Sequence, residues 1–251
     1  MAAPMPPNPA PTITASYCPF WSTGPTPSPM CVTASITHFP RRQHPLRPNT
    51  GSETVLAVVG RTMTATIDDL SRALDATGTL VAGVADDQWS APTPCTGWSV
   101  RDVVNHVTAG NHLFASSLRG NPLPVTVVGA PPDLLGPDPA GSFHASADAL
   151  VQAFALPGVL DREITLPMGQ VPAVQALNMR ITEMLAHGWD LARASGQTPR
   201  YPDSVVEDQI AFSRVLLPNL PAGRTPFAPS RPVPEDASPL DRLAALLGRT
   251  P

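Results

Sequence analysis

The chain has 251 residues, of which 33 are proline and only 14% are charged. Its formal net charge is −4, and all 16 basic residues are arginine because the sequence contains no lysine. The lack of lysine excludes Schiff-base chemistry and a P-loop, and the mildly acidic balance gives no electrostatic reason to expect nucleic acid or an anionic membrane as a partner.

The proline excess is concentrated at the front of the chain, where residues 1–50 hold twelve prolines and residues 1–52 hold no acidic residue. Proline removes a backbone donor and fixes φ, so this stretch builds neither a helix nor a strand. We expect a disordered, proline-rich extension over residues 1–62. It is either a leader such as a transit peptide or, as we favour, the product of a start codon assigned upstream of Met63. Residues 63–251 suffice for a single folded domain.

Apolar residues at helical spacing predict a first helix over residues 65–84. A second helix follows the capping box formed by Ser99 and Asp102 and runs to about residue 118. Residues 120–141 are rich in proline and glycine and predict a long crossover loop. The third helix is expected over residues 146–156.

Residues 161–169 predict a short strand or hairpin over one end of the domain. The clearest helix runs over residues 171–194, entered through Pro172 and stopped by Gly196. A fifth segment covers residues 202–217, and a short last helix covers residues 240–247. The predicted fold is therefore all-α: a four-helix bundle with a long crossover, a short hairpin and a short C-terminal helix.

Three polar side chains on two helices form the candidate site. Glu183 and His187 are four residues apart on the fourth helix, which puts them on one face. His106 lies at the margin of the apolar stripe of the second helix. Carboxylate and imidazole are good ligands for zinc, so the three together predict a divalent-metal site. The alternative is a set of core side chains that satisfy one another or bind water.

Three further residues are candidates around this site. Asp102, four residues before the histidine of the second helix, is expected to accept the second imidazole proton. Asp190, three residues after His187, is expected to do the same or to pair with Arg193. Arg180 lies on the ligand face and is expected to hold a substrate carboxylate. For each of them, an ion pair on the helix surface is an equally good interpretation.

The cysteines do not indicate a disulfide framework. Cys18, Cys31 and Cys95 are odd in number and widely spaced, so they predict neither disulfides nor a zinc ribbon and suit a reducing cytoplasm. A helix dipole ahead of the second helix would activate Cys95, but with no base evident beside it we favour a small buried packing residue. Three tryptophans are expected to close the ends of the bundle: Trp89, Trp98 and Trp189.

Two stretches carry a resemblance to a known family. Residues 89–107, WSAPTPCTGWSVRDVVNHV, resemble the signature of the N-terminal metal-binding domain of mycothiol-dependent maleylpyruvate isomerases. They are still more similar to the related actinobacterial single-domain metal-binding proteins of the DinB-like superfamily. Residues 180–197, RITEMLAHGWDLARASGQ, resemble the second family motif, and the ending from residue 226 is typical of the single-domain group. The resemblance covers about residues 63–251.

The resemblance implies a DinB-like four-helix bundle that holds a divalent metal, most often zinc, through a His…Glu-x-x-x-His set. The matching positions here are His106, Glu183 and His187. It also implies mycothiol as a thiol cosubstrate, whose thiolate a metal would favour. The chain departs from the isomerases after the bundle, where a short helix takes the place of their C-terminal domain. Because that domain supplies part of their active site, we do not expect isomerase activity itself to carry over unchanged.

Three hypotheses for the function follow. The favoured one is a metal-dependent, mycothiol-using transferase or isomerase that acts on an electrophilic small molecule in the cytoplasm. The second is a metal- or thiol-binding module that senses or buffers without catalysis. The third is a bundle whose polar trio binds only water. Nothing in the sequence indicates an oligomeric state.

Overall fold

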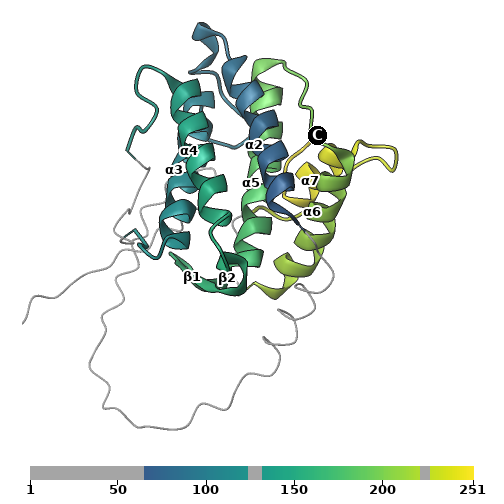
Figure 1. The fold of residues 1–251 in the computed structure, drawn as a ribbon. Helices are drawn as coiled ribbons and strands as arrows, with labels where there is room; N and C mark the ends of the chain where they lie inside the picture. Colours follow the sequence, from purple (N-terminus) through teal and green to yellow (C-terminus); the bar gives the residue numbers. More distant parts are fainter. Residues whose placement is uncertain (1–64, 124–131, 221–226) are drawn as a thin grey trace, which may run out of the picture.

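The computed structural model describes residues 65–123, 132–220 and 227–251 (Figure 1). This part of the chain is mostly helical, with one small two-stranded hairpin. The predicted proline-rich head and the middle of the predicted crossover lie outside the described residues. Within the described ranges, no helix is both long and apolar enough to cross a membrane.

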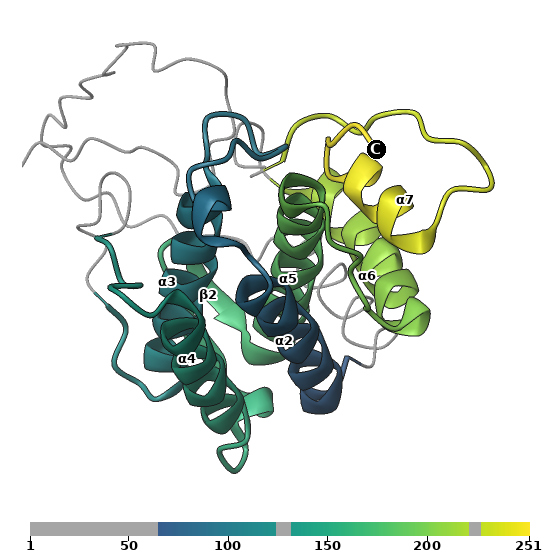
Figure 2. The same ribbon diagram turned by 90° about the horizontal axis from the view of Figure 1, so that it is seen from above.

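The four longest helices of the described part form a bundle (Figures 1 and 2). They are α2 (Ile67–Ala82), α3 (Val100–Leu118), α4 (Pro139–Phe154) and α5 (Ala173–Ser195). Around the bundle the order is α2, α4, α3, α5, so that each helix packs against two others and α3 lies beside α5. Their apolar faces meet in a single core that includes Leu70, Val104, Leu150 and Ile181. The prediction of an all-α bundle with four main helices is confirmed.

Side-chain caps fix where the first two helices begin. The hydroxyl of Thr66 accepts from the Asp69 backbone N–H at the start of α2, and Asp69 accepts from Thr66 in return. Ser99 and Asp102 form the same reciprocal pair at the start of α3, as the sequence predicts. The position of α3 along the bundle is therefore set locally, a short distance ahead of His106.

The third helix begins earlier than predicted. The sequence assigns residues up to 141 to the crossover, but α4 already begins at Pro139. The physical reason is that the Asp138 carboxylate accepts from the Gly141 N–H, and proline is favoured at the first helical position because its missing N–H is not needed there. Its other end, at Phe154, is within two residues of the prediction.

Short elements complete the described part of the chain. They are η1 (Asp86–Gln88), η2 (Val159–Asp161), β1 (Glu163–Leu166), β2 (Gly169–Pro172), α6 (Asp203–Leu216), η3 (Leu217–Asn219) and α7 (Pro239–Leu246). Strands β1 and β2 form the predicted hairpin, which is antiparallel and pairs Glu163 with Pro172. The hairpin lies at the end of the bundle where α3 ends, because the Arg162 Nη2 donates to the Leu118 carbonyl.

Helices α6 and α7 pack on the flank of α5, outside the bundle (Figure 2). Helix α7 is held there through Asp241, whose Oδ1 accepts from the Trp189 indole at 2.8 Å and from Arg193 at 3.1 Å. Its start is capped by Ser238. As a result, the segment that follows α7 lies against α5.

Candidate metal centre

The three predicted ligands lie together in the bundle interior, His106 on α3 and Glu183 and His187 on α5. The Glu183 Oε2 is 3.3 Å from His106 Nε2 and 3.8 Å from His187 Nε2, and one ligand atom from each residue lies within 4.8 Å of the other two. A tetrahedral zinc with bonds of about 2.0–2.1 Å separates its ligand atoms by about 3.4 Å. The donor set therefore fits an ion of zinc's size, with side chains only 2–4% exposed.

The protonation states around the trio suit a metal. Burial lowers the pKa of His106, because the imidazolium is desolvated, and the hydrogen bond to Glu183 opposes this only in part. Burial alone would raise the pKa of Glu183, but the hydrogen bond from His106 and the nearby His187 and Arg180 hold it below its usual value. At neutral pH His106 is uncharged and Glu183 ionised, which suits coordination once a metal takes the place of the Nε2 proton that His106 donates to Glu183.

Asp190 contacts His187, as one of the two sequence interpretations predicts. The His187 Nδ1 lies 3.1 Å from Asp190 Oδ2. When Nδ1 carries the proton and donates to this carboxylate, the lone pair is on Nε2, the nitrogen nearest Glu183. The 3.8 Å between that nitrogen and Glu183 Oε2 is too long for a hydrogen bond. The other interpretation is wrong, because Arg193 contacts Asp241 instead.

The Asp102 carboxylate is engaged at the start of its own helix. Its Oδ2 accepts from the Ser99 backbone N–H at 2.9 Å and from the Ser99 hydroxyl at 2.6 Å, so the carboxylate serves the start of α3. A residue of a capping box is committed to its own helix end, and that local bond outweighs the role predicted from the spacing of four residues.

Arg180 is buried beside the trio and is held by protein groups. Its Nη2 donates to the Asn111 side-chain oxygen at 2.7 Å and to the Val107 carbonyl at 3.2 Å, and its Nη1 lies 3.7 Å from Glu183 Oε2. Burial lowers the pKa of Arg180 to about 10, so it stays charged at neutral pH. The predicted contact with a substrate carboxylate stays a prediction; in this structure the guanidinium faces the Glu183 carboxylate.

Trp98 lies over both imidazoles. Its ring centroid is 4.8 Å from that of His106, edge-on, and 6.1 Å from that of His187, with the two planes only 8° apart. The sequence predicts that Trp98 closes a bundle end, and the structure adds the contact with both ligand residues. An indole against the rings restricts their rotation and covers them from water.

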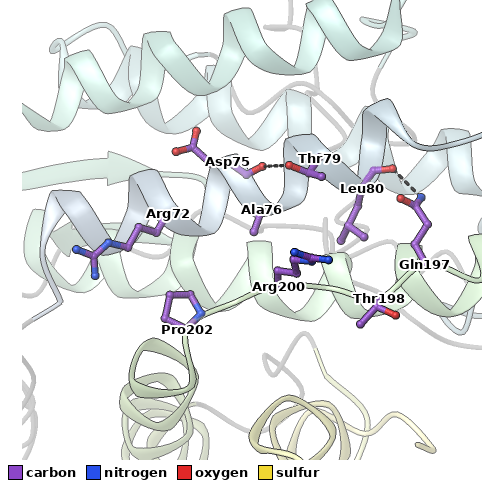
Figure 3. A pocket seen from close by; sticks show the side chains of 9 residues that line it. All are labelled: Arg72, Asp75, Ala76, Thr79, Leu80, Gln197, Thr198, Arg200 and Pro202. Atoms are coloured by element: carbon purple, nitrogen blue, oxygen red, sulfur yellow. Dashed lines mark hydrogen bonds between the residues drawn. The ribbon is translucent and has the colours of Figure 1, made fainter.

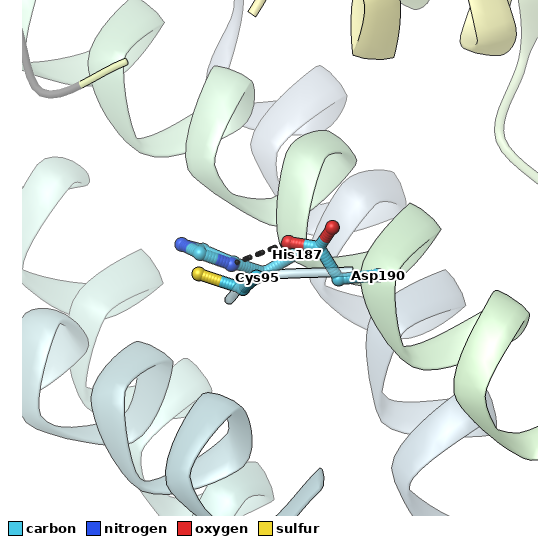
Figure 4. A group of neighbouring side chains, drawn as sticks. All are labelled: Cys95, His187 and Asp190. Carbon is cyan, nitrogen blue, oxygen red and sulfur yellow. Dashed lines mark hydrogen bonds and ion pairs between the residues drawn. The ribbon is translucent and has the colours of Figure 1, made fainter. Parts of the chain in front are cut away.

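Cys95, like Trp98, lies in the loop before α3 and is close to the site (Figure 4). Its sulfur, His187 Nδ1 and an Asp190 oxygen lie within 4.8 Å of one another. Burial, followed by the charge of Asp190, raises the pKa of the Cys95 thiol to about 12. The buried packing residue predicted from the sequence is confirmed by its 3% exposure, but the prediction that no base lies beside it is wrong.

Sequence reasoning missed Arg249, which follows α7. Its Nη2 is 2.8 Å from Asp190 Oδ2 and its Nε is 3.3 Å from Asp190 Oδ1. This guanidinium occupies both oxygens of the carboxylate, so the set of Cys95, His187 and Asp190 is poorly suited to hold a second cation. Arg249 lies 59 residues beyond its partner, and no local pattern signals the pair.

A separate hollow of about 530 Å³ lies on the surface between α2 and the connection from α5 to α6 (Figure 3). Its lining includes two arginines, Arg72 and Arg200, and the apolar residues Ala76 and Leu80. Arg72 is paired with Asp68 on its own helix. None of the three metal-ligand candidates lines this hollow, so it is not part of the candidate metal centre.

Similar sequences point to one family. The sequence model of the mycothiol maleylpyruvate isomerase N-terminal domain matches residues 70–192, a range that includes all three metal-ligand candidates. The uncharacterized proteins MT0763 and Rv0738, from two strains of Mycobacterium tuberculosis, are each 36% identical to the chain over 180 residues, which is 71% of this chain and 94% of theirs.

Solved structures similar to the chain include the mycothiol-dependent maleylpyruvate isomerase and a mutant of it. Both are 16% identical to the chain, with TM-scores of 0.44 and 0.42, and each comparison covers 57% of this chain and 68% of the other. The sequence model over residues 70–192 and the relatives that match over almost their full length decide the assignment. The chain belongs to the family of the mycothiol maleylpyruvate isomerase N-terminal domain.

Proposed function

We propose that the protein binds a divalent metal, zinc in the first place, through His106, Glu183 and His187, and that it acts as a mycothiol-dependent transferase or isomerase-like enzyme on an electrophilic small molecule. The observation that carries this proposal is the convergence of three donor atoms in a buried interior. Family membership supports the thiol. The DinB-like assignment of the bundle and a cytoplasmic location belong to the same proposal.

The chemistry expected from the metal is activation of a thiol. A divalent ion bound by these residues would lower the pKa of a coordinated thiol and so favour the nucleophilic thiolate. The chain's own residues prepare the site for it. Asp190 Oδ2 is placed to accept a hydrogen bond from His187 Nδ1, Arg180 stabilises the ionised Glu183, and Trp98 covers the two imidazoles.

A metal- or thiol-binding module without catalysis is the second candidate. The observation in its favour is the deep burial of the three donor side chains, since closed donor sets are typical of structural metal sites. Catalysis requires that a thiol and a substrate reach the metal, whereas a sensor or buffer requires only the metal or the thiol. A measurement of substrate turnover therefore distinguishes the enzyme from the non-catalytic module.

Metal content and zinc affinity test the proposal first. We expect the purified protein to carry close to one divalent ion per chain by elemental analysis, and His106→Gln and Glu183→Gln to lose it. His112→Gln is the matched control, because His112 lies on the same helix but is exposed, and it should retain the metal. Equal metal content in all four proteins would rule out the site.

Turnover then separates the enzyme from the module. With the zinc-loaded protein, we expect electrophilic substrates such as maleylpyruvate or activated halides to be consumed in the presence of mycothiol and not in its absence. Glu183→Gln should abolish the mycothiol-dependent rate while His112→Gln leaves it unchanged. Metal binding without any mycothiol-dependent rate would favour the module.

A further inference from the structure

Arg249 donates two hydrogen bonds to Asp190, one to each carboxylate oxygen. The distances are 2.8 Å from Nη2 to Oδ2 and 3.3 Å from Nε to Oδ1. Asp190 is completely buried and Arg249 is 7% exposed, so water does not compete for the pair. A planar guanidinium that holds both oxygens fixes the rotation of a carboxylate, which a single contact cannot do.

The fixed carboxylate is the one that binds His187. Asp190 Oδ2 accepts from Arg249 and also lies 3.1 Å from His187 Nδ1. Arg249 and His187 both contact Asp190 Oδ2. The orientation of the guanidinium therefore determines the position of the oxygen that the His187 imidazole contacts. The contact therefore runs from the segment after α7, through Asp190, to a residue of the candidate metal centre.

The backbone after α7 directs Arg249 inward. The Arg249 N–H donates to the Ala244 carbonyl and the Gly248 N–H to the Ala245 carbonyl, which is the Schellman arrangement for ending a helix. Gly248 has a φ of +85°, and a Cβ there would lie 2.6 Å from the Ala228 carbonyl oxygen. Only glycine fits this turn, and the turn places the guanidinium against α5.

We propose that Arg249 is a positioning residue of the metal centre. By clamping Asp190 it sets the orientation and tautomer of His187, so that metal affinity depends on the docking of α7 although α7 supplies no ligand. This proposal rests on the proposed binding of metal by His187. It adds a residue and an element that the donor set does not contain.

Zinc affinity of the full chain, measured by competition with a chromophoric chelator, tests the coupling. Loss of a partner that orients a metal-binding histidine costs about 10–100-fold in affinity, and we expect a loss of that size in Arg249→Gln. Arg242→Gln is the matched control. Arg242 lies on α7 and pairs with Glu207 of α6 near the surface, so its loss should change the affinity by less than about threefold.

The tautomer of His187 provides a readout that needs no metal. In protein labelled with ¹⁵N only in its six histidines, the His187 signal is identified by its absence in His187→Gln. We expect the metal-free wild type to show His187 with its proton on Nδ1, and Arg249→Gln to show a mixture of tautomers. Arg249→Lys keeps the charge but loses the two-pronged contact, and should restore affinity only in part.

Asp190→Asn tests the order of the contacts. If Arg249 acts through Asp190, then Arg249→Gln should add little to the affinity loss of Asp190→Asn. A wild type that binds no zinc would refute the proposed function while the tautomer measurement still tests the clamp. Wild-type affinity and tautomer in Arg249→Gln would overturn the inference, as would equal losses in Arg249→Gln and Arg242→Gln, which would indicate a general loosening of α7.

Discussion

Two buried arginines flank the candidate ligands, one on each side. Arg180 faces Glu183 from within α5, and Arg249 faces Asp190 from the segment after α7. A buried carboxylate without a cation or hydrogen bonds carries a large desolvation penalty. Burial alone would raise the pKa of Glu183 and of Asp190. The hydrogen bond of each carboxylate to a histidine, His106 or His187, lowers it first, and the neighbouring arginine adds to this, so both carboxylates stay ionised in a dry interior.

Room for Arg180 comes from a glycine on the neighbouring helix. A Cβ at Gly110 of α3 would lie 2.5 Å from Arg180 Nη1, and the guanidinium also lies over the Phe114 ring at 5.1 Å from its centroid. The close approach of α3 and α5 at this level therefore depends on a residue without a side chain. The same approach brings His106 to Glu183.

The Cys95 thiol should be unreactive in the folded protein. With a pKa of about 12 instead of 9.0, it holds about a thousandfold less thiolate at pH 8 than an ordinary cysteine, and the thiolate is the reactive form. In a chain with Cys18→Ser and Cys31→Ser, we expect Ellman's reagent at pH 8 to label no thiol until urea unfolds the protein. Rapid labelling of the native form would contradict the raised pKa.

The same shift has a consequence at high pH. Because the pKa of Cys95 is raised on folding, its contribution to stability is fully present below about pH 9 and is lost as the pH rises toward 12. Cys95→Ser should remove this contribution from the alkaline unfolding curve and leave the curve near neutral pH unchanged in shape.

The sequence predicted which side chains converge in the candidate centre better than it predicted their partners. Glu183 and His187 stand out because a spacing of four residues puts them on one helix face, and His106 stands out because it borders an apolar stripe. Asp102 was mispredicted because its carboxylate binds the adjacent cap. Arg249 could not be predicted, since its contact with Asp190 depends on how α7 docks.

At the level of elements, the start of α3 is defined by its own residues. Its capping box joins Ser99 and Asp102 through reciprocal backbone hydrogen bonds. Because His106 lies close to this end of α3, the cap also fixes the position along the bundle axis at which His106 contacts α5. The hairpin lies at the opposite end of α3, where Arg162 donates to the Leu118 carbonyl.

Ser99→Ala should lower the free energy of unfolding by about 1 kcal/mol, the usual cost of removing a helix cap, with an unchanged urea m-value. Ser71→Ala is the matched control. The Ser71 hydroxyl donates to the Ile67 carbonyl within α2, and such a bond in a helix interior contributes little. Urea unfolding followed by circular dichroism measures both, and equal losses would contradict the role of the cap.

Element boundaries were predicted well where caps announce them and poorly at α4. Ser99 and Gly196 mark helix ends in the sequence, and the structure uses both. The start of α4 was missed because a proline-rich stretch suggests a loop, whereas Pro139 occupies the one helical position that suits proline. A local pattern can therefore support two structures, and the Asp138 cap decides between them.

For the whole molecule, the order of helices around the bundle is what the sequence could not supply. Periodicity identifies apolar faces but does not say which faces meet. In the structure α3 packs on α5 and α2 on α4, and this arrangement alone brings His106 to the other two ligands. The core that results is drawn from all four bundle helices.

We expect a chain that begins at Met63 to fold and to bind zinc like the full chain. The match to the family model begins at residue 70, and α2 is capped by Thr66. For a protein of this size about 1 kcal/mol shifts the melting temperature by about 2–4 °C. Calorimetry of both chains should give the same melting temperature within that range, and a larger decrease would show that residues 1–62 stabilise the domain.

The four buried charged groups around the candidate ligands have an electrical consequence. The two carboxylates of Glu183 and Asp190 and the two guanidinium groups of Arg180 and Arg249 sum to zero, and coordination requires uncharged imidazoles. A divalent ion would leave the dry interior with two uncompensated positive charges, which a low effective dielectric makes costly. Electroneutrality would then favour an anion as the remaining ligand, and the thiolate of the proposed cosubstrate meets that requirement by its charge alone, whatever its shape.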